Sequence, residues 1–356
     1  MKEIVPRQRL LFEGIQYLRG IAAMMVVFHH ARHEFGGAMS VTFGARGVEI
    51  FFVISGLVMM YSTKGGMVVA GLTLKERASE AILFWKRRFM RVAPLYWIAL
   101  FLSAQFVYRV DLTDLVLVKD AFFIPHWNRA FPDHLWPTLV PGWSLNYEMF
   151  FYFLFGLSLL FRRSSAMMLC AFVIALCALP LAVQSDLPAF IFYTAPVMLH
   201  FIAGVLLYYL IEALRRRPAW LAPRWAACLA FLAGFFGLGL VPGWAGDFWL
   251  ILPSSLIVIS AVFLFDGIRL PVLRLLGDAS YSIYLFHLLA FTLAHRLISW
   301  LGLSAVSKWE ILANFAVYAI VAGAAGVAAH IVLEKPIADY AALFLRRKAA
   351  TVAIAR

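Results

Sequence analysis

Uninterrupted apolar runs of about 20 residues recur along the whole chain, and this feature restricts the fold more than any other. A helix needs roughly 20 apolar residues to cross the hydrocarbon core of a bilayer, which is about 30 Å thick. Hydrophobic residues make up 63% of the 356 residues and charged residues 14%, whereas a soluble domain carries about 25% charged residues. The chain is therefore predicted to be an all-α integral membrane protein.

The apolar runs predict about ten transmembrane helices that form a single bundle. Their approximate ranges are 14–32, 46–62, 89–108, 143–161, 165–183, 190–211, 225–241, 248–266, 279–300 and 311–333. Most connectors are short and contain Gly, Pro or Arg, which is typical of turns between helices. The prediction assigns residues 1–345 to one transmembrane domain and residues 346–356 to a basic cytoplasmic tail.

The formal net charge of +12 raises the question of a nucleic-acid partner. Basic residues beside membrane spans have a simpler explanation, because cytoplasmic loops are enriched in Lys and Arg. If the N-terminus is inside and the chain crosses ten times, 24 of the 31 Lys and Arg residues fall on the cytoplasmic side. Both termini are therefore predicted to be cytoplasmic. Membrane lipids are expected partners, and no nucleic acid is expected.

The three cysteines, Cys170, Cys177 and Cys228, lie inside apolar runs and form neither a disulfide framework nor a metal-ligand spacing. No metal site is predicted. The first apolar run follows a basic N-terminus, as in a signal peptide, but it lacks a small-residue cleavage site. It is predicted to be a retained first helix.

The first predicted helix carries Arg19 near its cytoplasmic end and His30 near its outer end. Their separation of eleven residues is three helical turns, or roughly 16 Å, so both lie on one face. Histidine can accept and return a proton near neutral pH, as activation of a sugar hydroxyl requires. We expect His30 to be a general base, with His29 as the main competitor. The alternative is a histidine that only hydrogen-bonds the bundle.

Two carboxylates are predicted at the outer level of His30. Glu49 opens the second helix and Glu148 the fourth, where Asn146 also lies. A carboxylate in this position can orient an imidazole or bind an acceptor sugar. The alternatives are an interfacial carboxylate for Glu49 and, for Glu148, stabilisation by the positive end of the helix dipole.

Arg88 and Arg91 share one face at the cytoplasmic entry of the third predicted helix. Paired guanidinium groups bind phosphate through several hydrogen bonds. The positive-inside rule alone also explains cations at this boundary. In the ninth predicted helix, Tyr284 lies one turn from both Ser280 and His287. This polar stripe fits substrate binding and interhelical hydrogen bonding equally well.

Six short motifs occur in order along the chain. Arg19 and His30 are separated by ten residues, Arg88 and Arg91 by two, and an aromatic stretch ends in Ile-Ser-Gly. Further motifs are Trp-Ser-Leu-x-x-Glu at 143–148, Ser-Tyr-Ser-Ile-Tyr-Leu-x-His at 280–287 and Glu-x-Pro at 334–336. In this combination the chain resembles the acyltransferase-3 family of membrane acyltransferases over nearly its whole length. Residues 146–152 are most similar to exopolysaccharide O-acetyltransferases.

The resemblance implies acyl transfer from cytoplasmic acetyl-coenzyme A to a hydroxyl of a polysaccharide or lipid-linked glycan, in a multi-pass protein of the bacterial inner membrane. It implies catalytic roles for His30, Glu49 and Glu148, and donor binding by Arg19, Arg88 and Arg91. The implied substrate-binding residues are Trp143, Ser144, Asn146, Tyr284 and His287. The chain departs from the family in having Glu49 where Asp is common and in the pair His29-His30 where one histidine is common.

A glycan or lipid transporter is the alternative from another functional class, because it would also place polar residues around a central cavity. Transporters often contain two matching halves or broken helices in corresponding positions. The sequence shows neither feature, which favours the enzyme.

Overall fold

The computed structural model describes residues 6–32, 42–63, 65, 71–111, 113–161, 165–216, 224–241, 246–265, 267–302 and 308–354. Every regular element in these ranges is helical, which confirms the predicted all-α class. The α-helices are α1 (Pro6–Ala31), α2 (Gly47–Ser62), α3 (Leu74–Phe106), α4 (Leu115–Ala121), α5 (Gly142–Ser158), α6 (Ser165–Ala178), α7 (Pro188–Tyr193), α8 (Leu199–Arg215), α9 (Arg224–Leu240), α10 (Ile251–Leu264), α11 (Pro271–Asp278), α12 (Ser280–Trp300), α13 (Lys308–Ala329) and α14 (Lys335–Ile354). Short 3₁₀ segments are η2 (Thr42–Arg46), η4 (Leu179–Leu181), η5 (Pro196–Met198) and η8 (Asp247–Leu250), and η9 (His330–Glu334) is a π-helical turn.

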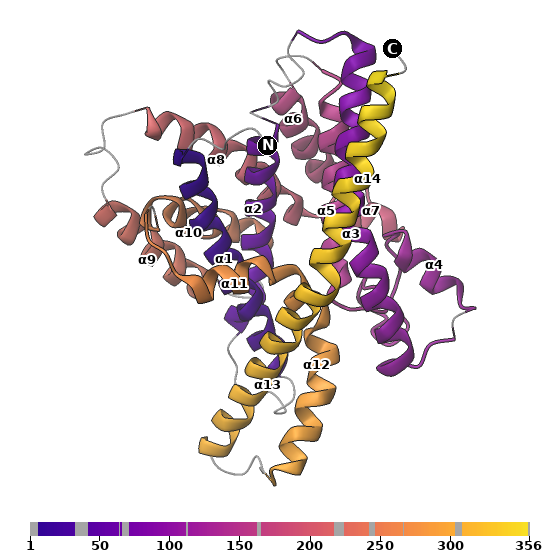
Figure 1. The fold of residues 1–356 in the computed structure, drawn as a ribbon, viewed down its shortest axis with the longest axis vertical. Coiled ribbons are helices and arrows are strands. Elements are labelled where there is room, and N and C mark those ends of the chain that lie inside the picture. Colours follow the sequence, from indigo (N-terminus) through magenta and orange to yellow (C-terminus); the bar gives the residue numbers. More distant parts are fainter. Residues whose placement is uncertain are drawn as a thin grey trace.

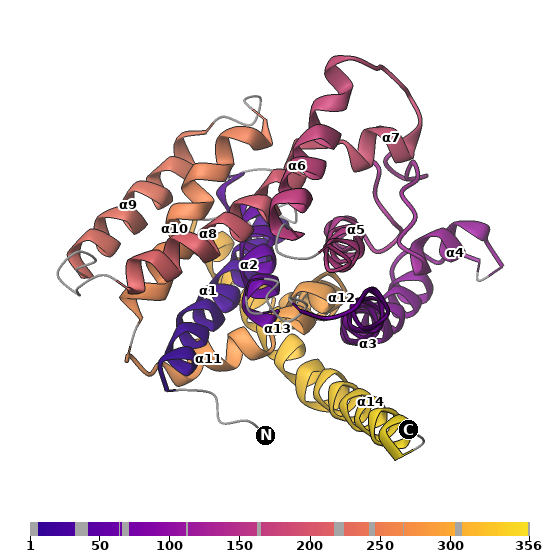
Figure 2. The same cartoon turned by 90° about the horizontal axis from the view of Figure 1, so that it is seen from above.

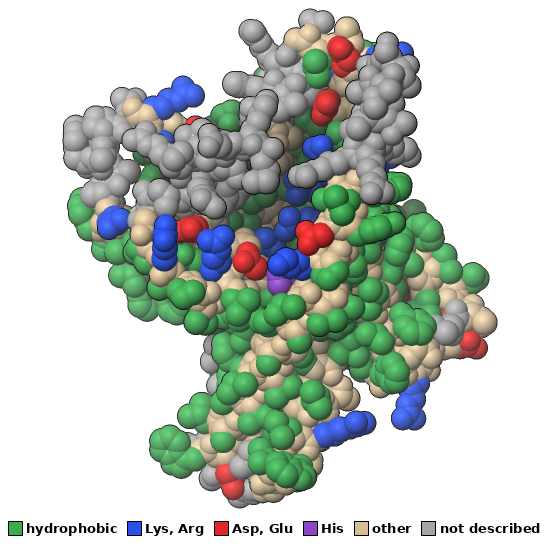
Figure 3. Space-filling view, viewed as in Figure 1, with side chains coloured by type: hydrophobic (Ala, Val, Ile, Leu, Met, Phe, Trp, Pro, Cys, Tyr) green, Lys and Arg blue, Asp and Glu red, His purple; other side chains and the backbone are tan. Residues whose placement is uncertain are grey.

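Within the described residues, six helical stretches are long and apolar enough to cross a bilayer. They are Phe43–Ser62, Leu74–Phe106, Pro188–Arg215, Asp247–Leu264, Ser280–Trp300 and Trp309–Phe344, and two shorter apolar helices cover Ser165–Leu181 and Arg224–Leu240. Large hydrophobic side chains such as Leu232, Phe236 and Ile320 are exposed on helix surfaces, as lipid-facing side chains must be. Figure 3 shows a broad hydrophobic area, with charged side chains gathered above it. The protein is a multi-pass membrane protein, and the count of ten crossings stays a prediction.

The helices are arranged on two sides of α1 and α2. Figures 1 and 2 place α8, α9 and α10 on one side and α3, α4 and α5 on the other. Three clusters of buried hydrophobic residues hold these parts together, and Phe51 of α2 packs against all three. The core is therefore centred on α2.

Glycines bring α2 and α8 into close contact. A Cβ atom on Gly56 would lie 2.0 Å from the carbonyl oxygen of Phe201, and one on Gly204 would lie 2.1 Å from that of Val53. Small residues at such positions let helix backbones approach each other in membranes, where packing drives helix association. The crossing fixes the position of α2, which borders the candidate site.

Helix α3 begins at Leu74, fifteen residues before the predicted start at 89. Thr73 and Glu76 form a capping box, in which the Thr73 hydroxyl accepts from the Glu76 amide at 3.3 Å and the Glu76 carboxylate accepts from the Thr73 amide at 2.8 Å. The prediction relied on apolar residues alone and missed this start, because charged residues dominate the first turns. Arg88 and Arg91 therefore lie inside a long helix and not at its entry.

Two other predicted helices have different ends. The run at 190–211 is broken into α7, η5 and α8, with Pro188 and Pro196 at the starts of the first two segments, because proline suits the first turn of a helix and disrupts its interior. The predicted end near Glu334 is instead the π-helical turn η9, which joins α13 to α14. Helix α14 continues to Ile354, into the predicted tail.

The start of α1 and the end of α14 lie at the same end of the molecule, whereas the end of α12 and the start of α13 lie at the opposite end (Figure 1). This arrangement agrees with termini on one side of the membrane. Their cytoplasmic location stays a prediction.

Candidate active site

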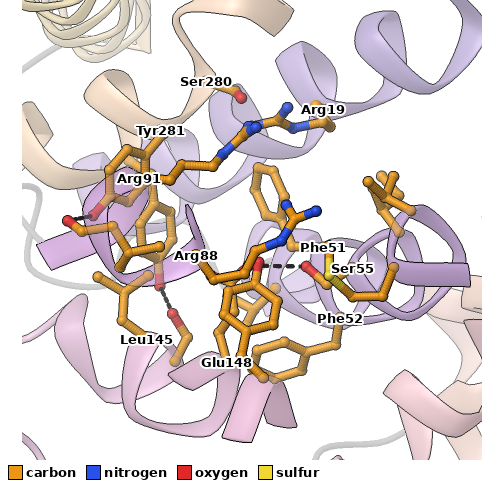
Figure 4. Close-up of a pocket in the computed structure, with 18 residues that line it drawn as sticks. Arg19, Phe51, Phe52, Ser55, Arg88, Arg91, Leu145, Glu148, Ser280 and Tyr281 are labelled. Atoms are coloured by element: carbon orange, nitrogen blue, oxygen red, sulfur yellow. Dashed lines mark hydrogen bonds between the residues drawn. The ribbon is translucent and has the colours of Figure 1, made fainter. Parts of the chain in front are cut away.

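Five helices enclose a central cavity with about 820 Å³ of empty space, including the part that is open to the surroundings. Its polar lining comes from residues that are far apart in the sequence. They are Arg19 of α1, Ser55 of α2, Arg88 and Arg91 of α3, Ser144, Glu148 and Tyr152 of α5, and Ser280, Tyr281 and Tyr284 of α12. Figure 4 shows the three arginines converging on this space.

The arginines make the cavity strongly positive. Arg88 and Arg91 lie on one face of α3, and Arg19 approaches from α1. The Arg88 guanidinium lies over the rings of Phe84 and Tyr152, at 5.5 and 5.7 Å from their centroids. Its Nε atom is buried and has no hydrogen-bond partner in the described part of the chain. The cavity thus presents several donors with the geometry that suits phosphate oxygens.

Glu148 is the carboxylate that lines this arginine cavity. Its Oε1 atom accepts hydrogen bonds from Ser55 of α2 at 3.1 Å and from the hydroxyl of Tyr152, one turn away on α5. Two donors from different helices therefore fix the carboxylate among the guanidinium groups. This environment differs from the outer-face position that the sequence suggested, because neighbours that are distant in sequence determine where the side chain points.

His30 and His287 form a pair beside the cavity. The Nδ1 atom of His30 lies 3.1 Å from Nε2 of His287, and the ring centroids are 4.9 Å apart. His287 is completely buried, and its Nδ1 lies 2.7 Å from the backbone oxygen of Tyr284. Tyr284 itself lines the arginine cavity. The structure thus connects the histidine pair to the cavity through one turn of α12.

Tyr284 is held from several sides. Its hydroxyl lies 2.7 Å from that of Ser144 and donates to the backbone oxygen of Pro141 at 3.0 Å. Its ring lies edge-on to Phe51, 6.0 Å between centroids. These contacts fix the segment of α12 on which the histidine pair depends.

The other predicted site residues have different surroundings. Glu49 accepts from Arg46 at 3.5 Å, and its Oε2 has no hydrogen-bond partner among the described residues. Trp143 packs edge-on against Phe52 and Tyr147. Asn146 borders a separate open cleft with several aromatic side chains; within the described ranges its buried Oδ1 is unsatisfied.

Neither Ser55, which belongs to the Ile-Ser-Gly motif, nor Tyr152 was predicted to contact Glu148, yet both donate hydrogen bonds to its carboxylate. A signal for Tyr152 was present, because a hydroxyl four residues after a carboxylate lies on the same helix face. For Ser55 no such local signal exists, because its partner is 93 residues away.

The segment between α3 and α5 has its own buried polar pair. Asp120 of α4 is inaccessible to solvent and accepts from the Thr138 amide at 3.0 Å, and its Oδ1 lies 3.1 Å from Nε2 of His126. Burial raises the pKa of Asp120 to about 6 and lowers the pKa of His126. The Tyr96 hydroxyl of α3 donates to the Asp120 backbone oxygen at 3.2 Å, and this hydrogen bond joins α4 to α3.

Comparisons with known proteins agree with this architecture. The acyltransferase-3 model, described as an acyltransferase domain, matches residues 12–334. The exopolysaccharide production protein ExoZ of Rhizobium meliloti (strain 1021) is 30% identical, over 88% of this chain and 94% of that protein. The acyltransferase MdmB of Streptomyces mycarofaciens is 26% identical over 93% of each chain. A putative O-acetyltransferase of Staphylococcus aureus (strain COL) is 24% identical over 79% of this chain and 51% of the relative. No solved structure matches.

Proposed function

Since this chain belongs to the acyltransferase-3 family, we propose that it is a membrane O-acyltransferase that moves an acetyl group from cytoplasmic acetyl-coenzyme A to a glycan hydroxyl. The proposed acceptor is a cell-surface polysaccharide or a lipid-linked glycan, and the proposed location is a bacterial inner membrane. The relatives named for exopolysaccharide production and O-acetyl transfer support this choice.

The observation that carries the proposal is the arginine cavity beside a histidine pair. Arg19, Arg88 and Arg91 outnumber the single carboxylate of Glu148 among the described lining residues, so the cavity favours an anion. The buried Nε of Arg88 is a donor that has no hydrogen-bond acceptor among the described residues. Both features fit the phosphate groups of coenzyme A, and the bound thioester would supply the acyl group. We expect the hydrogen bonds from Ser55 and Tyr152 to hold the Glu148 carboxylate in place, so that it does not pair with the arginines that bind the donor.

His30 acts as the general base in this proposal. Its imidazole accepts the proton of the acceptor hydroxyl while the oxygen forms the new bond to the acyl carbon, and it returns the proton to the departing sulfur. General-base catalysis of this kind contributes roughly 10²- to 10⁴-fold in rate. In this proposal Glu148 sets how positive the cavity is, because its carboxylate lies among the three arginines. Tyr284 and Ser144 shape the space between donor and acceptor.

Transfer of label tests the proposal against transport. Purified protein in detergent is incubated with acetyl-coenzyme A labelled in the acetyl group and with crude bacterial exopolysaccharide, and the glycan is separated and counted. We expect label to enter the glycan and to be released by mild base, as an O-ester is. A transporter would leave the label on coenzyme A, and that result would refute the enzymatic proposal.

A further inference from the structure

We propose that His287 is the positioning residue for His30, and that it holds the His30 imidazole with its proton on Nδ1 and its lone pair on Nε2. The inference deepens the proposed function and rests on it for the catalytic consequence. The proton positions themselves follow from the hydrogen-bond geometry and the burial of His287, whatever the activity.

The backbone oxygen of Tyr284 can only accept a hydrogen bond, and it lies 2.7 Å from Nδ1 of His287. Nδ1 of His287 must therefore carry a proton. His287 is completely buried, and an ionised imidazole without a carboxylate partner is costly in such a place. The neutral ring then has its lone pair on Nε2.

The Nδ1 atom of His30 lies 3.1 Å from Nε2 of His287, which carries that ring's lone pair, and 3.2 Å from the backbone oxygen of Val26. Both neighbours are acceptors, so Nδ1 of His30 is the donor. The lone pair of neutral His30 consequently lies on Nε2. Two backbone carbonyl groups, one on α1 and one on α12, therefore specify both tautomers.

This arrangement has a direct chemical use. A general base needs one defined nitrogen with a lone pair, and the partner of the other nitrogen fixes which one it is. When Nε2 of His30 takes the proton of the acceptor hydroxyl, the Nδ1 proton stays on His30, and its bond to His287 becomes charge-assisted and stronger. His287 receives no proton and touches no substrate. In other enzymes a carboxylate orients the catalytic histidine. In this protein the neutral ring of His287 has that role.

The first experiment reads the proton positions without using activity. Protein labelled with ¹⁵N and ¹³C histidine is reconstituted in lipid vesicles, and magic-angle-spinning NMR distinguishes protonated from unprotonated ring nitrogens at neutral pH. Spectra of His30→Gln and His287→Gln assign the two rings. We expect protonated Nδ1 and unprotonated Nε2 for both. A His30 ring with its proton on Nε2 would overturn the inference, whether or not the protein transfers acetyl groups.

The second experiment measures acetyl transfer. Glutamine places an amide oxygen near the position of Nε2, so His287→Gln should keep activity within a few-fold. Phenylalanine fills a similar volume without an acceptor, and His287→Phe should lower kcat by about 10- to 100-fold, with unchanged binding of acetyl-coenzyme A. His295→Gln on the same helix is the matched control, because His295 pairs with Tyr318 away from the cavity.

Three outcomes of the transfer assay are decisive. Full activity in His287→Phe, or equal loss in the Phe and Gln variants, would overturn the positioning role. Loss of donor binding in His287→Phe would point to general damage of the site, and would also overturn it. If the unmodified protein transfers no label, the proposed function fails, while the NMR spectra still decide the tautomers.

Discussion

Replacement of Gly56 by alanine should weaken the contact between α2 and α8 and thereby disturb the cavity. The new Cβ would lie 2.0 Å from the backbone oxygen of Phe201, which is 1.4 Å short of the 3.4 Å at which ordinary contact begins. A backbone oxygen cannot rotate away as a side chain can, so the helices must separate. Overpacking of this kind costs about 1–3 kcal/mol.

The effect should reach the site because Ser55 precedes Gly56 on α2 and donates to Glu148 at 3.1 Å. We expect Gly56→Ala to lower the apparent melting temperature of the detergent-solubilised protein by several degrees and to reduce acetyl transfer. Gly204→Ala should act similarly, because its Cβ would lie 2.1 Å from the Val53 oxygen on the other side of the same crossing.

Gly323→Ala provides the matched control. The nearest atom to a Cβ at this position in α13 is the sulfur of Met24, at 3.8 Å. Alanine is favoured over glycine within a helix by about 1 kcal/mol, so this variant should melt at the same temperature or higher. A Gly56→Ala protein as stable and active as Gly323→Ala would refute the close crossing of α2 and α8.

Three further predictions concern topology, pH and donor binding. A topology reporter fused after Arg356 should be active only in the cytoplasm and one inserted near Pro132 only outside, and reporters on the same side would contradict the ten-helix topology. The raised pKa of Asp120, about 6 against about 3.9 in an unfolded chain, means that its contribution to stability is present at pH 4 and is lost as the pH rises through 6. The melting temperature of Asp120→Asn, measured relative to that of the unmodified protein, should therefore be higher at pH 7 than at pH 4. An equal difference between the two proteins at both pH values would contradict the raised pKa of Asp120. Arg88→Lys and Arg91→Lys should each weaken binding of acetyl-coenzyme A by about 10- to 100-fold through lost guanidinium hydrogen bonds, whereas Arg87→Lys, an exposed neighbour, should bind normally; unchanged affinity in all three would leave the arginines with a topological role only.

The helices were predictable where a single physical cause dominates. Long apolar runs indicate helices such as α12 and α13 because a bilayer imposes length and hydrophobicity together. The early start of α3 was missed because a capping box, and not hydrophobicity, sets it. The break between α7 and α8 was missed because its prolines lie within a run that is apolar enough to span the membrane.

The site was predictable residue by residue but not as an arrangement. Spacing within one helix placed Arg88 beside Arg91, and resemblance to a family singled out Arg19, Glu148 and Tyr284. Their convergence in one cavity depends on the packing of five helices, which no local pattern encodes. The pairing of His30 with His287 joins residues 257 positions apart. Only the tertiary structure shows that the partner of His30 is a second imidazole.

Acetylation of glycan by single histidine variants tests the central claim, that His30 is the general base, most directly. His30→Ala and His29→Ala are compared at equal membrane abundance, with labelled acetyl-coenzyme A and exopolysaccharide, and donor binding is measured on the same preparations. We predict that His30→Ala abolishes transfer while binding of acetyl-coenzyme A is largely retained, because the arginines hold the donor separately. His29→Ala should lose less activity, since its side chain lies about 100° around α1 from that of His30. Full transfer by His30→Ala would contradict the account: with loss in His29→Ala it would assign catalysis to the neighbouring histidine, and with activity in both it would exclude histidine catalysis.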